Sequence, residues 1–175
     1  MRAFIAFTAT TAILTGSAAA QSTWQEYTYP NQQFAVSFPA EPTVTTASFH
    51  TANGATVPET IYSVQQDTGV FRLAVIDFAN AGIDRNAAID QAVMALQQNG
   101  DIKLSMEARV QRNYGRYLNI AGKDGSHTIA AVFFGNNRLY ELEGTVPASN
   151  PDALSGELIR FQQSLRFMGD AARGR

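Results

Sequence analysis

One ten-residue segment constrains the fold of this chain more than any other. Residues 102–111 read IKLSMEARVQ and alternate strictly between apolar and polar side chains. Successive side chains of a β-strand point to opposite faces, so strict alternation is typical of a strand with one buried and one solvated face. We therefore expect Leu104 to lie in the core and Arg109 to face solvent.

Further strands are indicated by apolar runs separated by turn residues. Residues 70–78 and 128–134 are almost entirely apolar, as expected of central strands covered on both faces. Asn53-Gly54 lies between two segments rich in β-branched residues, and this dipeptide favours the positive φ angles of a tight hairpin turn. Because short turns join antiparallel neighbours, the sheet should be largely antiparallel. Further turns are expected at residues 67–69, 113–115, 123–125 and 135–137.

Two helices are predicted from apolar residues at helical spacing. The first begins after Asp84, a favourable N-cap, and ends at Gly100. The second begins at residues 150–152, where Asn, Pro and Asp form a helix start. The sequence therefore predicts an α+β fold, in which a mostly antiparallel β-sheet is flanked by two main helices. The apolar stripes consist of Ile89, Ala92, Val93 and Leu96 in the first helix, and of Leu154, Leu158, Phe161 and Leu165 in the second.

The amino terminus has the three parts of a secretory signal peptide. Arg2 precedes an apolar run over residues 3–14, and small residues follow up to Ala20. The apolar run is shorter than the roughly 20 residues that a membrane-spanning helix needs. We expect residues 1–20 to be removed by cleavage after Ala20, which leaves no membrane span. The remaining chain would be a single domain over residues 21–168 with a disordered tail at 169–175, located in the periplasm or secreted.

Composition excludes several classes of function. The chain has no cysteine, which rules out thiol nucleophiles, thiolate metal sites and sulfur redox chemistry. Its formal net charge of −2 gives no basic field for nucleic acid. Gly-rich phosphate loops and the usual metal-ligand spacings are also absent from the sequence. We expect no catalytic residue, no metal ligand and no cofactor.

Three short motifs resemble those of exported bacterial PsbP-like domains. They are FAVSFPAEP at residues 34–42, RLYEL at 138–142 and RFQQSLRF at 160–167, and they occur in the order seen in that family. The resemblance spans residues 24–168 and implies a PsbP-like α/β/α sandwich, the fold shared by PsbP of photosystem II and the Ran-binding Mog protein. Members of this group are non-enzymatic partners of larger assemblies. The motifs contain core and turn residues, so the resemblance transfers no binding residue.

Histidine chemistry offers the main alternative to a binding role. The sequence contains His50 and His127, and Asp124 is close enough to His127 to orient it as a base. Ser126 precedes His127 directly, but neighbours on a strand point to opposite faces and cannot pair. A hydrolase or metal-dependent enzyme built on His127 and nearby carboxylates is therefore the less favoured interpretation.

Three acidic residues have two interpretations each. Glu141 and Glu143 lie at i and i+2, hence on one strand face, where they either reach one cation or form a solvated face near Arg138. Asp77 ends an apolar strand and either accepts N–H groups of the following loop or acts as a ligand. The structural interpretation is favoured in both cases.

Aromatic residues before the first strand suggest a contact surface. Trp24, Tyr27 and Tyr29 either form a patch for a protein partner or cover the core of the domain. Tyr114 and Tyr117 flank an expected turn. The favoured function is an exported, non-catalytic binding or accessory domain of the cell envelope that engages a protein partner. A structural or stress-related envelope factor without a ligand is the alternative.

Overall fold

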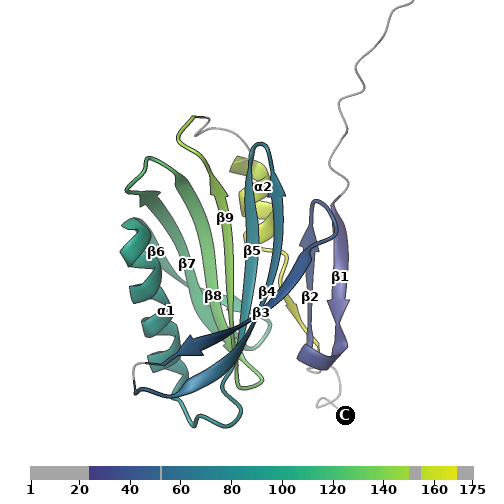
Figure 1. Cartoon of the computed structure of the whole chain (residues 1–175), viewed down its shortest axis with the longest axis vertical. Coiled ribbons are helices and arrows are strands. Elements are labelled where there is room, and N and C mark those ends of the chain that lie inside the picture. The colour runs from purple at the N-terminus through teal and green to yellow at the C-terminus, as the bar shows by residue number, and fades with distance from the viewer. Residues whose placement is uncertain (1–23, 52, 150–154, 169–175) are drawn as a thin grey trace, which may run out of the picture.

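A computed structural model describes residues 24–51, 53–149 and 155–168. The larger of its two sheets has seven strands in the order β3-β4-β5-β9-β8-β7-β6, and all neighbours are antiparallel (Figure 1). The smaller sheet has the order β1-β2-β10. The strands of the larger sheet are β3 (Thr43–His50), β4 (Thr56–Gln66), β5 (Gly69–Asp77), β6 (Gly100–Val110), β7 (Asn113–Gly122), β8 (His127–Gly135) and β9 (Arg138–Val146); those of the smaller are β1 (Gln25–Tyr29), β2 (Phe34–Phe38) and β10 (Arg166–Phe167), with a 3-10 turn at Pro30–Gln32 after β1.

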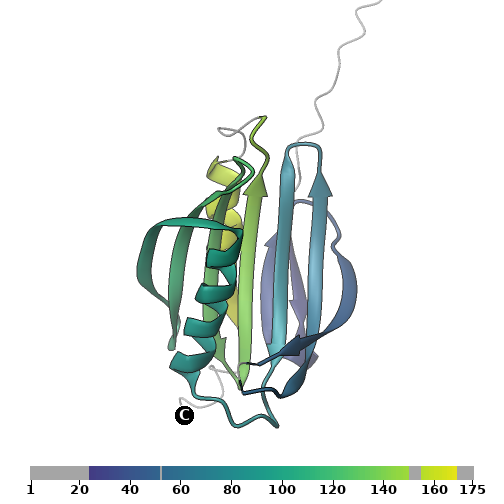
Figure 2. The same ribbon diagram turned by 60° about the vertical axis from the view of Figure 1, so that its left-hand side comes forward.

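The elements form three layers, and the seven-stranded sheet is the middle layer. Helix α1 (Arg85–Asn99) covers one face of it, whereas α2 (Ser155–Gln162) and the three-stranded sheet cover the other (Figures 1 and 2). Each face therefore has its own apolar core. Phe71, Tyr140 and Phe161 belong to the core under α2, and Ile76, Leu96 and Leu139 to the core under α1. The predicted α+β fold, with an antiparallel sheet and two helices, is confirmed.

Local signals in the sequence account for several element boundaries. The side chain of Asp84 accepts hydrogen bonds from the backbone N–H groups of Asn86 and Ala87, which caps α1 as expected. Gly54 has a φ of 84° in the β3–β4 connection. The expected signal peptide at 1–20, the helix start at 150–152 and the tail at 169–175 lie outside the described residues.

The prediction that Leu104 lies in the core is wrong. Leu104 and Met106 are 48% and 47% exposed, because β6 is an edge strand and α2 packs over β8 and β9 instead. A bulge between Ile102 and Leu104 also shifts the strand register. As a result, Ile102 packs toward α1 whereas Ala108 packs in the opposite core. The alternation identified a strand correctly but not how deeply it is buried.

The turn expected at residues 113–115 lies two residues earlier. Gln111 adopts a φ of 56°, and its side-chain amide exchanges two hydrogen bonds with the backbone of Phe167 in β10. Gly115 belongs to β7, where a Cβ atom would approach the carbonyl oxygen of Val132 to 2.1 Å. This glycine is required for close strand packing rather than for a turn.

Candidate functional site

A groove of about 460 Å³ lies between the first turns of α1 and the β6–β7 hairpin. Ile89 is buried against the sheet. Arg85 and Asn86, one helical turn before it, and Asp90, directly after it, therefore line the wall of the groove. The floor comes from the strands that face α1. The lining residues are Arg85, Asn86, Ile89 and Asp90 from α1, Glu107 from β6, and Tyr114, Gly115 and Arg116 from β7.

Two guanidinium groups lie close to the ring of Tyr114 at this groove. The guanidinium carbons of Arg85 and Arg109 lie 5.3 and 5.0 Å from the centre of its ring, within the range of a cation–π contact. Arg109 is the register partner of Tyr114 across β6 and β7, whereas Arg85 comes from α1. The tyrosine remains 49% exposed. Both arginines are themselves exposed, and the Nε–H of Arg85 also donates a long hydrogen bond of 3.5 Å to Oδ1 of Asn86.

A third arginine extends the positive charge along the floor. Arg116 donates a hydrogen bond of 3.3 Å to the hydroxyl of Ser105, and its register partner is Glu107. In the part of the chain that the structure describes, Arg85, Arg109 and Arg116 form no ion pair with a carboxylate. Guanidinium groups bind carboxylates in a bidentate manner, so these arginines offer donors to an acidic group. The groove itself is lined by both charges, because Asp90 and Glu107 lie beside Arg85 and Arg116.

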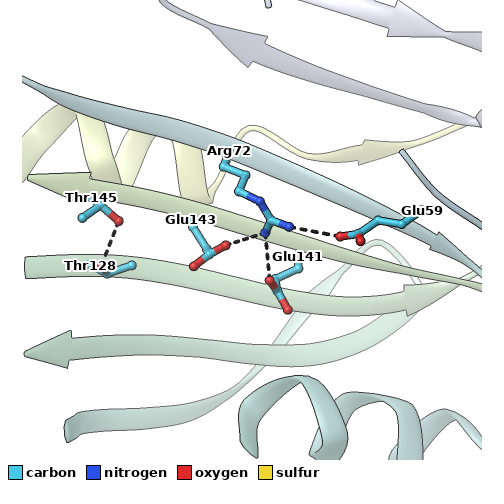
Figure 3. Close-up of polar contacts among 6 residues, drawn as sticks. All are labelled: Glu59, Arg72, Thr128, Glu141, Glu143 and Thr145. Atoms are coloured by element: carbon cyan, nitrogen blue, oxygen red, sulfur yellow. Dashed lines mark hydrogen bonds and ion pairs between the residues drawn. The ribbon is translucent and has the colours of Figure 1, made fainter. Parts of the chain in front are cut away.

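A second charged cluster lies on the same sheet face, over the central strands (Figure 3). Arg72 of β5 contacts three carboxylates, at 3.0 Å from Glu59, 3.1 Å from Glu141 and 2.6 Å from Glu143. The three glutamate side chains are only 12–16% exposed. Burial, followed by the charge of Glu143, raises the pKa of Glu141 to about 8 although Arg72 opposes the shift. The cluster is an internal ion-pair network that favours a proton on Glu141.

The favoured interpretation of Glu141 and Glu143 as a solvated strand face near Arg138 is wrong, because their side chains are only 12% and 16% exposed. Glu141 and Glu143 share one strand face, as the sequence predicted, but their partner is Arg72 rather than Arg138. Arg138 instead pairs with Asp77 at 3.0 Å. Asp77 also accepts the backbone N–H of Ala79 at 2.9 Å, which agrees with the favoured interpretation of this residue. Among the described residues, no group of three or more His, Cys, Asp or Glu is arranged to hold a metal ion.

The pairing considered for His127 is not formed. Its Nε2 atom lies 2.8 Å from the Oδ1 atom of Asn119, on the neighbouring strand β7. The carboxylate of Asp124 accepts the backbone N–H of Ser126 within the turn. Asp124 therefore shapes the β7–β8 turn and does not orient the imidazole.

The predicted aromatic patch is half-buried against the core. The ring of Trp24 packs edge-on against Phe71 at 5.3 Å, and the guanidinium of Arg160 lies 4.9 Å from its centre. Tyr27 and Tyr29 also pack against this core. The core-covering interpretation accounts for these contacts, whereas a partner contact at the remaining exposed edges stays a prediction.

Sequence reasoning did not find the Tyr114 groove. It assigned Tyr114 to a turn. No motif or spacing in the sequence indicates that Arg85, in a helix, and Arg109, in a strand, lie close together. A usable signal existed in residues 107 and 109, which alternation places on one face together. The convergence with α1 depends on how the helix lies over the sheet, which the sequence pattern does not specify.

Comparisons with known proteins support the fold. No family model matches the chain, and no curated protein matches it. A solved structure, the solution structure of cyanobacterial PsbP (CyanoP) from Synechocystis sp. PCC 6803, is similar with a TM-score of 0.54 and 9% sequence identity. The similarity covers 87% of this chain and 97% of the cyanobacterial protein. The chain therefore has a PsbP-like fold. No helix among the described residues has the length and apolar character needed to cross a membrane.

Proposed function

We propose that this protein is an exported, non-catalytic accessory domain of the cell envelope that binds a protein partner through the Tyr114 groove. The observation that carries the proposal is the Arg85–Tyr114–Arg109 arrangement at this groove. The PsbP-like fold supports an accessory role, and the sequence of residues 1–20 supports export.

The partner would present an acidic segment with an apolar or aromatic neighbour. Carboxylates would bind the N–H groups of Arg85, Arg109 and Arg116, since these form no ion pairs with carboxylates among the described residues. Tyrosine and arginine are enriched at the energetic centres of protein interfaces, because they combine large contact area with directed hydrogen bonds. Asp90 and Glu107 line the same groove and would discriminate against uniformly acidic chains by repulsion.

Site-specific photo-crosslinking tests this proposal in intact cells. A benzophenone amino acid at position 114 should crosslink one partner reproducibly, because this position is exposed within the groove. The matched control carries the same amino acid at position 112, which is exposed in the adjacent turn but does not line the groove. The proposal fails if position 114 yields no adduct, or only the adducts that position 112 yields.

Affinity measurements then identify the residues that bind. With the crosslinked partner purified, the double substitution Arg85→Ala and Arg109→Ala should weaken binding at least tenfold, because both guanidinium groups at Tyr114 are lost. Arg112→Glu lowers the net charge by the same two units outside the groove and should leave the affinity unchanged. Equal losses for both variants would indicate unspecific electrostatic attraction and would contradict the proposal.

A further inference from the structure

Strand β6 presents an open edge with apolar side chains beside it. It is the last strand of the seven-stranded sheet, and among the described residues it pairs with β7 alone. Its outer backbone N–H and C=O groups are therefore available to another strand. Leu104 and Met106 lie on one face of this edge and are nearly half exposed. An exposed edge of this kind is suited to pairing with a further strand.

The charges along β6 are arranged symmetrically about Ser105. Lys103 precedes it at the same spacing at which Glu107 follows it. If two copies of β6 run antiparallel with Ser105 opposite Ser105, Lys103 of each copy lies opposite Glu107 of the other. Asp101 precedes the bulge and stays outside this pairing; within one copy it forms an exposed ion pair of 3.2 Å with Lys103. Opposite charges at facing positions stabilise a strand pair, whereas like charges destabilise it. The sequence of this edge is thus complementary to itself in one register.

The apolar residues agree with the same register. Leu104 of one copy would lie opposite Met106 of the other, and the same pair recurs across the symmetry axis. Each contact would remove exposed apolar surface from water. The opposite edge of the sheet, β3, also exposes an apolar side chain, since Val44 is 52% exposed, but its sequence TVTTASFH contains no Lys, Arg, Asp or Glu and so lacks the charge pattern.

We infer that two copies of this protein associate through antiparallel pairing of their β6 strands, centred on Ser105. The bulge at Lys103 bends the strand before this point, which limits the regular pairing to residues 103–107. The interface is therefore small, at or below the roughly 1,200 Å² that marks weak complexes. We expect a reversible dimer that forms with increasing concentration. The inference does not rest on the proposed function, although Glu107 lines the Tyr114 groove as well.

Charge reversal tests the register directly by sedimentation equilibrium. The wild-type protein should show a concentration-dependent rise in mass toward the dimer. Lys103→Glu places two glutamates opposite each other, and Glu107→Lys places two lysines opposite each other, so each variant alone should dimerise at least tenfold more weakly. An equimolar mixture of the two variants restores opposite charges at every facing position and should dimerise as the wild type does.

Several outcomes would overturn the inference. A wild-type protein that remains monomeric up to about 1 mM, well into the range of weak association, would exclude the dimer. Dimers that both variants form unchanged would place the interface elsewhere, as would a mixture that stays monomeric. Arg112→Glu controls for net charge, because residue 112 follows β6 in the turn, and it should leave the association constant unchanged. Circular dichroism of each variant confirms that the sheet is intact.

Discussion

The carboxyl group of Glu141 shows how a single side chain couples the stability of this fold to pH. It lies beside Glu143 and Arg72 on a strand face where all three glutamates are largely buried. One guanidinium neutralises only one negative charge, so the cluster carries an excess of negative charge when all carboxylates are ionised. A proton on Glu141 relieves this repulsion.

Glu141→Gln should therefore flatten the pH dependence of stability. The pKa of Glu141 is raised from 4.5 to about 8 by burial and by Glu143. The folded state consequently retains a proton that the unfolded state releases, and the free energy of unfolding falls as pH rises from about 5 to about 8. Glutamine mimics the protonated form at every pH, so the variant should be more stable than wild type at pH 8, by on the order of 1 kcal/mol.

Urea unfolding at pH 5, 6.5 and 8 measures this effect. Glu107→Gln is the matched control, because Glu107 is exposed at the groove and its substitution should preserve the wild-type slope. A wild-type stability that stays constant or increases across this range would show that Glu141 is ionised in the folded protein.

At the scale of elements, the β6–β7 hairpin illustrates what the sequence can and cannot predict. Strict alternation in β6 predicted a strand, because period-2 patterning is a local property of the backbone. It did not predict the exposure of Leu104, since burial depends on whether another layer covers that position. Gly115 was interpreted as a turn residue because glycine favours turns, yet its role is set by Val132 and Phe133 on the adjacent strand.

Gly115→Ala should destabilise the protein by about 1–3 kcal/mol or more. Its Cβ atom would meet the carbonyl oxygen of Val132 at 2.1 Å and the ring of Phe133 at 2.3 Å, and overpacking of this kind forces the strands apart. Gly156→Ala is the control, because a Cβ there would meet nothing within 4 Å beyond its own helix backbone and chain neighbours, and alanine favours the helix. Urea midpoints compare the two; an equal, small change in both would show that β7 and β8 tolerate a side chain at 115.

The groove at Tyr114 also belongs to this scale. Its residues come from α1, β6 and β7, each of which the sequence predicted in approximate position. Asp84 fixes where α1 begins and therefore where Arg85 lies. The contact between Arg85 and Tyr114 nevertheless depends on the packing of the helix over the sheet, and no pattern within either element encodes it.

On the scale of the whole molecule, the last strand, β10, packs against strands from the beginning of the domain. It pairs with β2, and the ring of Phe167 packs edge-on against Tyr140 of β9 at 5.0 Å. Gln111 in the β6–β7 turn binds the backbone of the same residue. One two-residue strand thus contacts both sheets.

Phe167→Ala should cost about 3–5 kcal/mol of unfolding free energy, as expected for removal of a buried phenylalanine ring. Arg166→Ala changes the adjacent residue, whose ion pair with Glu26 is exposed, and should cost less than about 1 kcal/mol. Thermal and urea unfolding both report the difference. Similar small losses for the two variants would mean that β10 contributes little to the packing between the sheets.

The strand order of the large sheet determines how far apart in the chain its neighbours lie. Every neighbouring pair in it is consecutive in sequence except β5 and β9, where Asp77 pairs with Arg138 and Val70 with Thr145. The two halves, β3 to β5 and β6 to β9, can each form through short hairpins, whereas joining them requires closure of a long loop. Pairing of β5 with β9 should therefore be the slow step of folding, and the newly made chain should become protease-resistant only at the rate of this step.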